Sequence, residues 1–199
     1  AGLIRDRFGD RVTLVEGDCL AKGRRLSPEV VSALEGAEFK LVANLPYQAA
    51  SPLMASLLMH HPECSGQWVT IQKEVVDRLV ANPGTKAWGP LTAIVRAFAS
   101  ARRIALLPPG CFWPAPKVTS AMAELVPCAS DSRPSDPDGF ARFVTKLLSQ
   151  RRKQIGGILG HDITASLRIE AQTRAETLDA GQLLELRDHL PADHHLMQP

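Results

Sequence analysis

The order of apolar segments predicts an α/β domain followed by a small helical region. Up to residue 81, short apolar strands alternate with helical segments, which is the spacing of a parallel sheet covered by helices on both faces. After Gly89-Pro90 the pattern changes to one helix and two apolar strands, which predicts an antiparallel edge. Apolar residues spaced by three and four in 140–148 and 183–186 predict the helical region.

Local signals place the elements of the first part. Residues 3–8 form the end of an amphipathic helix that stops at Gly9, and a strand is expected at 11–15. Ser27-Pro28 supplies a helix N-cap followed by proline at the first helical position, and 39–43 is a short apolar strand. We then expect a helix near 49–61, a strand at 67–72, a helix at 73–81 and a turn at 82–84.

The second part consists of a helix up to residue 98 and strands at 100–107 and 119–126, on either side of a proline-rich loop. Pro, Ser and Asp dominate from residue 127 to residue 138, which is typical of a linker. We therefore expect one domain at 1–128, a linker at 129–138 and a helical domain at 139–199.

Composition excludes several classes of protein. The 199 residues are 45% hydrophobic and 22% charged, which excludes a disordered or collagen-like chain. Arginines and histidines interrupt every apolar run before the ~20 residues that a membrane helix needs. The net charge of +2 means that any basic surface is local. Four cysteines without a CxxC pair predict a reduced, cytoplasmic setting with no zinc site.

Asn44-Leu45-Pro46-Tyr47 follows the apolar strand directly. Ligands of open α/β sheets bind beyond the carboxyl ends of the strands. The Asn44 side-chain oxygen and a backbone carbonyl held by Pro46 can accept hydrogen bonds from an exocyclic amino group, while Tyr47 can stack on an extruded base. An ordinary strand-ending turn with a half-buried tyrosine explains the same four residues equally well.

Other segments carry weaker signals. Asp18, in Glu16-Gly17-Asp18-Cys19, can accept a hydrogen bond from a nucleotide-like cofactor, although such turns are common. In the segment 112–118, Phe112 and Trp113 present aromatic faces and Lys117 can meet a phosphate, or the segment is a rigid hydrophobic connector.

Charged residues and histidines decide little by themselves. Arg151-Arg152-Lys153 suits nucleic-acid contact or is a solvated face, and Glu74 with Arg78 fits a surface ion pair. The adjacent pairs His60-His61 and His194-His195 indicate solvated side chains, and we assign no metal.

Five segments occur in an order that closely resembles one family, the KsgA-like small-subunit ribosomal RNA adenine dimethyltransferases. They are Gly17-Asp18, Asn44-Leu45-Pro46-Tyr47 and the segments 72–79, 112–118 and 150–153. The resemblance implies a Rossmann-like class I methyltransferase sheet with a small C-terminal helical domain. It also implies S-adenosylmethionine-dependent N6,N6-dimethylation of adjacent adenosines in a 3′-terminal hairpin of small-subunit rRNA, coupled to ribosome assembly.

The resemblance also assigns roles to residues. Asn44, Pro46, Tyr47 and Phe112 would form the catalytic group, with the Asn44 side chain and the Pro46 carbonyl receiving the amino group's protons and the two rings stacking on adenine. Asp18, Cys19 and Asn44 would contact the cofactor. The RNA phosphates would be met by Lys73, Arg78, Lys117, Arg151, Arg152 and Lys153. The partner is the assembling small ribosomal subunit, and a monomer is expected.

The chain departs from this family at its front. No Gly-x-Gly cluster occurs in the sequence, so the first strand, its cofactor-binding loop and the second strand are expected to be missing. We therefore expect this polypeptide alone to bind S-adenosylmethionine poorly.

Three alternatives stay open. The first is a non-catalytic RNA-binding or ribosome-assembly remnant, and the second is a resistance-type methyltransferase acting on large-subunit rRNA. A DNA adenine methyltransferase fits less well, because that group usually has two prolines where this chain has Leu45-Pro46.

Overall fold

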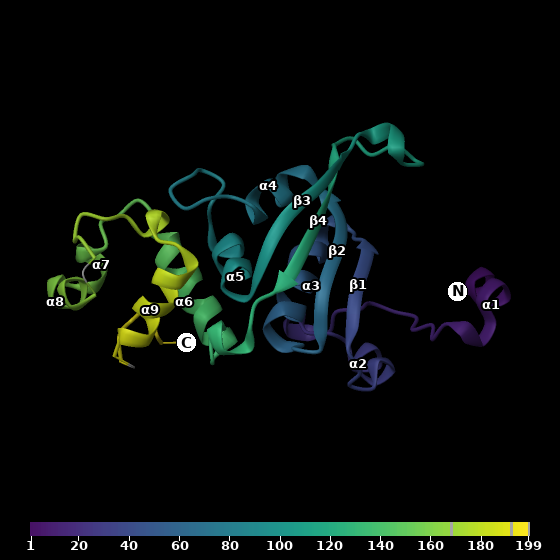
Figure 1. Ribbon diagram of the computed structural model, residues 1–199, viewed down its shortest axis with the longest axis horizontal. Coiled ribbons are helices and arrows are strands. Elements are labelled where there is room, and N and C mark those ends of the chain that lie inside the picture. Colours follow the sequence, from purple (N-terminus) through teal and green to yellow (C-terminus); the bar gives the residue numbers. More distant parts are fainter. Residues whose placement is uncertain (168, 192, 199) are drawn as a thin grey trace.

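A mixed four-stranded sheet forms the centre of the molecule (Figure 1). The computed structural model describes residues 1–167, 169–191 and 193–198. The strands are β1 (Phe39–Asn44), β2 (Cys64–Gln72), β3 (Ala99–Leu107) and β4 (Ser120–Pro127), in the order β1-β2-β4-β3. β1 and β2 are parallel, whereas β4 is antiparallel to both of its neighbours. The predicted antiparallel edge is therefore confirmed.

Helices cover one face of this sheet. α3 (Tyr47–His60), α4 (Lys73–Leu79) and α5 (Pro90–Phe98) pack on it, as the ribbon view shows. The side chains of β1 alternate between half-buried and exposed, and Val42 is 78% exposed on the opposite face. The expectation of helices on both faces is therefore wrong for the described residues, because alternate side chains of the short apolar strand point to solvent.

A polar network crosses the open face. Trp68 on β2 lies opposite Glu124 on β4, and Glu124 lies opposite Arg102 on β3. The Trp68 Nε1 donates to Glu124 Oε1 at 3.0 Å, and Arg102 forms an ion pair with the same carboxylate. These contacts give the open face a hydrogen-bonded surface of its own.

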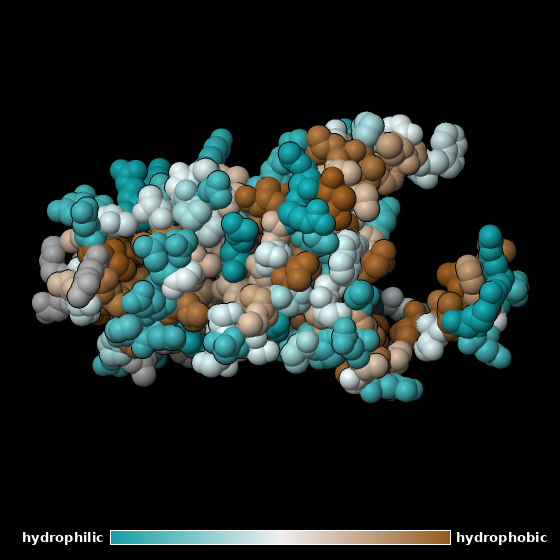
Figure 2. All heavy atoms as spheres, in the orientation of Figure 1, coloured by the Kyte–Doolittle hydropathy of each residue, from teal (hydrophilic) through white to brown (hydrophobic). Residues whose placement is uncertain are grey.

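The N-terminal segment lies apart from the sheet. α1 (Gly2–Phe8) ends at Gly9, as predicted, and a short 3-10 turn η1 (Gly9–Arg11) follows. The strand expected at 11–15 is not formed, since no described strand lies beside this segment to pair with it. Figure 2 shows apolar atoms of this helix facing solvent, and Leu3 is 86% exposed.

The next segments match their local signals. A 3-10 turn, η2 (Lys22–Arg24), precedes α2 (Pro28–Leu34), and the Ser27 hydroxyl accepts a hydrogen bond from the Val30 amide as an N-cap should. α3 begins two residues before its predicted start, and the proline-rich loop between β3 and β4 contains the turn η3 (Pro109–Cys111).

The C-terminal helices share a core with the sheet part. They are α6 (Pro137–Ser149), α7 (Gly156–Leu159), α8 (His161–Ser166) and α9 (Ala180–His189), with the turns η4 (Ser130–Ser132) and η5 (Ala175–Thr177). α5 packs against α6 and α9, and Phe98 meets Phe140 edge to face at 6.4 Å between ring centroids. Because α6 begins at Pro137, the last two residues of the expected linker are helical. Among the described residues, the helices are all too short or too polar to cross a membrane.

Candidate functional site

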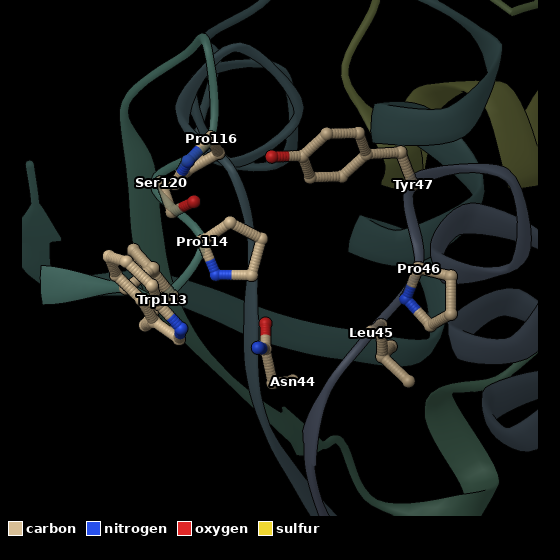
Figure 3. A pocket seen from close by; sticks show the side chains of 9 residues that line it. Asn44, Leu45, Pro46, Tyr47, Trp113, Pro114, Pro116 and Ser120 are labelled. Carbon is tan, nitrogen blue, oxygen red and sulfur yellow. The ribbon is translucent and has the colours of Figure 1, made fainter. Parts of the chain in front are cut away.

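A cavity of about 390 Å³ lies at the carboxyl end of β1 (Figure 3). The strand end and the start of α3 line it on one side with Asn44, Leu45, Pro46 and Tyr47. The β3–β4 loop and the start of β4 line the other side with Phe112, Trp113, Pro114, Pro116 and Ser120. The structure thus brings together two motifs that sequence reasoning singled out separately.

Strand register explains why these segments meet. Asn44, the last residue of β1, is level with Thr70 on β2. Gln72, two residues further along β2, pairs with Ser120, the first residue of β4. The loop that leads into β4 therefore arrives at the sheet edge where β1 ends.

Two hydrogen-bond acceptors of this cavity have no partner within the described part of the chain. The Asn44 side chain makes no hydrogen bond there, and Figure 3 shows it directed into the cavity. The Leu45 amide donates to the Thr70 carbonyl at 3.1 Å, whereas the Leu45 carbonyl accepts no hydrogen bond from a described residue. Both groups are available to a ligand that donates hydrogen bonds.

The Pro46 carbonyl is not available in this way. It accepts hydrogen bonds from the Ala49 and Ala50 amides, each at 3.0 Å, in the first turn of α3. The expected role of Pro46 as the second acceptor is therefore wrong, because the carbonyl belongs to the helix. The neighbouring Leu45 carbonyl has no such partner, and a sequence pattern alone could not separate the two carbonyls.

Aromatic side chains surround the acceptors. Tyr47, the first residue of α3, is 45% exposed, and Figure 3 shows its hydroxyl directed across the cavity toward Pro116 and Ser120. Trp113 is 98% exposed and Phe112 is half-buried. A flat, hydrogen-bonding ring such as a nucleobase matches these walls.

Asp18 and Cys19 do not line this cavity. The Asp18 carboxylate accepts a hydrogen bond from the Leu20 amide at 3.0 Å, and the Cys19 carbonyl accepts one from the Ser27 amide at 2.9 Å. Burial, followed by the nearby Asp18 charge, raises the pKa of the Cys19 thiol. Both residues thus make hydrogen bonds within the segment 18–27, and their contact with a cofactor stays a prediction.

Some of the cations expected to contact RNA form ion pairs within the protein, and the others do not. Lys73 pairs with Asp77, which also binds Arg103 at 3.0 Å. The ion pair on α4 is therefore between Lys73 and Asp77, and the predicted pair between Glu74 and Arg78 is wrong.

Arg151 is also held within the protein. Its Nε donates to Glu176 at 2.7 Å and its Nη1 to the Trp88 carbonyl at 3.3 Å, which ties the end of α6 to η5. Lys153 donates to the Gln150 side chain at 3.1 Å. Within the described ranges, three of the predicted cations are exposed and have neither an ion pair nor a side-chain hydrogen bond: Arg78, Lys117 and Arg152.

The histidines at the end of α3 are not solvated, contrary to expectation. His60 Nε2 lies 3.3 Å from Asp138, and His61 Nδ1 lies 2.8 Å from Glu63. Their side chains are only 14% and 12% exposed, because the helix end packs against neighbouring elements. The described residues contain no group of three or more potential metal ligands.

The fold resembles those of solved RNA-modifying enzymes. Solved structures that resemble the chain include a dimethyladenosine transferase from Plasmodium falciparum and the 23S rRNA methyltransferase ErmE. The first has a TM-score of 0.67 and 24% identity, and covers 74% of this chain and 64% of that chain. The second has a TM-score of 0.61 and 17% identity, and covers 96% of this chain and 77% of that chain. The fold is that of a Rossmann-like class I methyltransferase, as the resemblance implied.

The family follows from sequence comparison. The model of the ribosomal RNA adenine dimethylase family matches residues 4–190, and the chain belongs to that family. The ribosomal RNA small subunit methyltransferase A of Acidithiobacillus ferrooxidans is 38% identical over 164 residues, and that of Erwinia tasmaniensis is 36% identical over 190. These alignments cover 79% and 93% of this chain. They span 61% and 68% of the length of the relatives.

Proposed function

We propose that this chain binds the acceptor adenosine in the S-adenosylmethionine-dependent N6,N6-dimethylation of small-subunit rRNA. One observation carries the proposal: the free acceptors of Asn44 and Leu45 lie in a cavity with Tyr47 and Phe112. A 6-amino group has two hydrogens to donate, and these two oxygens can take both. The small-subunit assignment is supported by the names of the relatives.

The chemistry of the acceptor side follows from these groups. Hydrogen bonds to the Asn44 side chain and the Leu45 carbonyl fix the amino group and direct its lone pair away from both oxygens. Stacking on Tyr47 and Phe112 holds the extruded adenine in one plane. Positioning of this kind supplies acceleration without a covalent enzyme intermediate.

S-adenosylmethionine would supply the methyl group, but the described residues do not form a cradle for it. Asp18 is folded into its own turn outside the cavity, and the sequence has no Gly-x-Gly loop. We expect this polypeptide alone to show no measurable rise in Tm with S-adenosylmethionine, because stabilisation requires binding to the folded state. A clear, saturable rise would contradict this view.

RNA contact beyond the adenosine is assigned to the exposed cations. Arg78, Lys117 and Arg152 would meet phosphates, and Lys153 could join them by releasing Gln150. Lys73 and Arg151 would take part only by giving up ion pairs. We also propose that the partner is the assembling small ribosomal subunit and that the protein is monomeric and cytoplasmic. The domain limits 1–128 and 139–199 stay part of the proposal.

The first test measures recognition of the amino group. A 3′-terminal small-subunit hairpin with two adjacent adenosines is compared with the same RNA carrying N6,N6-dimethyladenosines. We expect the unmodified hairpin to bind about tenfold more tightly, since dimethylation removes both donors. Asn44→Ala should reduce this difference, because only the Leu45 carbonyl then remains to accept one of the two hydrogens. Asn82→Ala, at an exposed asparagine in a turn, is the matched control.

Two results would overturn parts of the proposal. Equal binding of both hairpins by the native chain would show that Asn44 and Leu45 do not read the amino group. Equal or tighter binding of an unmodified large-subunit hairpin would favour the resistance-type alternative.

A second candidate is an RNA-binding chain without methyl transfer, because the Asp18 carboxylate expected to contact the cofactor is hydrogen-bonded within its own turn. The chain is incubated with S-adenosylmethionine and the unmodified hairpin, and the RNA is analysed by mass spectrometry. Because we expect this polypeptide alone to bind S-adenosylmethionine poorly, unmodified RNA fits both candidates, and only methylation separates them. Methylated adenosine that is absent with Asn44→Ala would exclude the binding-only candidate.

A further inference from the structure

A second cavity, of about 490 Å³, lies where η2, α3, α5 and α6 meet, and the three helices are labelled in Figure 1. It shares no lining residue with the Asn44 cavity. Its apolar walls include Pro52 and Met59 of α3 and Leu91 and Ile94 of α5. A volume of this size is typical of sites for small organic ligands.

Ser56, a residue of the cavity wall, carries a buried hydroxyl group without a partner. Ser56 on α3 is only 4% exposed, and its Oγ makes no hydrogen bond. Burying a hydroxyl without a hydrogen bond is unfavourable, and such groups are uncommon in folded proteins. A ligand that brings a polar edge into the cavity would satisfy it.

The rim of the cavity has one positive charge that no carboxylate balances. Asp138 of α6 accepts a hydrogen bond from Arg25 at 2.6 Å and lies 3.3 Å from His60, so its charge is already paired. Arg24 is exposed and has no ion pair with any described residue. An anionic group on the ligand would balance the charge of Arg24.

The backbone of Arg24 supports a functional interpretation. Its φ of +62° lies in the left-handed region, which non-glycine residues seldom adopt. Strained positions of this kind persist when the surrounding structure fixes them, and they are frequent at ligand sites. The residue in this left-handed conformation is an arginine that lines the cavity.

We propose that this cavity binds a nucleoside monophosphate, with the base between the apolar walls, its polar edge toward Ser56 and its phosphate on Arg24. An acyl chain would leave the Ser56 hydroxyl unpaired, and inorganic phosphate would leave the apolar walls uncovered. A nucleotide supplies a flat body, a hydrogen-bonding edge and an anion together. The same chemistry is offered by a free nucleotide and by a nucleotide extruded from RNA.

Isothermal titration of the whole chain tests this site with guanosine and uridine 5′-monophosphates. Neither presents the 6-amino group of adenine, so neither suits the Asn44 cavity. We expect at least one of them to bind with a Kd below about 1 mM, and guanosine, uridine or inorganic phosphate alone to bind at least about tenfold more weakly. Asn44→Ala should leave nucleotide binding unchanged, which separates this proposal from the acceptor-site proposal.

Two variants address the site without threatening the fold. Arg24→Gly removes the cation and relieves the left-handed backbone, and Ser56→Ala removes an unpaired buried hydroxyl. Neither should lower Tm. We expect affinity to fall at least about tenfold with Arg24→Gly and about fivefold with Ser56→Ala. Lys22→Gly, in the same turn but outside the lining, is the matched control and should bind like the native chain.

Each outcome decides the question. Lack of binding by both nucleotides, binding of phosphate alone as tight as that of nucleotide, or unchanged affinity in both site variants would overturn the proposal. Once binding is established, a single-stranded oligonucleotide of alternating G and U is added as competitor. Competition that Arg24→Gly weakens identifies an RNA nucleotide as the occupant, and lack of competition identifies a free nucleotide.

Discussion

Replacing Tyr47 by alanine should weaken RNA binding while leaving the fold intact. The ring is 45% exposed in the free protein, so one face is open to a base and little apolar area is lost from the core by truncation. Base stacking on an aromatic side chain contributes about 1–3 kcal/mol. Because the half-exposed ring covers the base from one side only, we expect the lower part of that range, about 1–2 kcal/mol. This corresponds to a loss of about 5- to 30-fold in affinity.

Fluorescence anisotropy with a labelled, unmodified small-subunit hairpin measures this loss. Phe8→Ala is the matched control, because Phe8 is an aromatic residue of α1 with a similar exposure of 41%. Tyr47→Phe keeps the ring and should bind like the native chain. If Tyr47→Ala binds as tightly as Phe8→Ala, the stacking argument fails. If Tyr47→Phe loses as much as Tyr47→Ala, the hydroxyl group rather than the ring face carries the interaction.

Four further substitutions test other parts of the structure. Arg151→Gln should lower the free energy of unfolding by about 1 kcal/mol in urea titrations because its ion pair is lost, whereas Arg152→Gln should leave stability unchanged and reduce RNA affinity. Gly66→Ala should cost about 1–3 kcal/mol in the same assay, since a Cβ there would lie 2.6 Å from the Trp68 ring; an unchanged midpoint would show that the ring moves freely. Burial, followed by the Arg25 charge, lowers the pKa of His60 below 6.5, so the folded state resists protonation and stability should fall as pH drops below that value. His60→Gln should reduce this fall between pH 7.5 and 5.5, and an identical pH profile in both proteins would contradict the assignment.

Local signals in the sequence were sufficient for most elements. The Ser27 N-cap, the proline at the start of α5 and the apolar spacing within α6 each act through neighbouring residues, and the structure has a helix at each position. The strand expected at 11–15 failed for a different reason. A strand needs a partner, and whether one lies beside it is a property of the whole fold.

The candidate site also has parts that local sequence signals predict and parts that depend on the whole fold. The pattern of residues identified Asn44 and Tyr47, and the resemblance placed Phe112 with them. The sequence could not show that the Pro46 carbonyl is used by the first turn of α3, because two adjacent carbonyls differ only in backbone geometry. The burial of His60 and His61 also depends on packing between elements that are distant in the sequence.

The position of β4 between β2 and β3 determines when the acceptor cavity can form during synthesis. β2 cannot complete its ladder, and β3 has no partner, until residue 127 has left the ribosome. Long-range pairings of this kind form slowly compared with helices. The nascent chain therefore exposes one open edge of β2 and the unpaired strand β3 while the loop carrying Phe112 is already made, and the cavity closes only when the last strand inserts. A pause in translation shortly before residue 120 would prolong that exposure and promote aggregation.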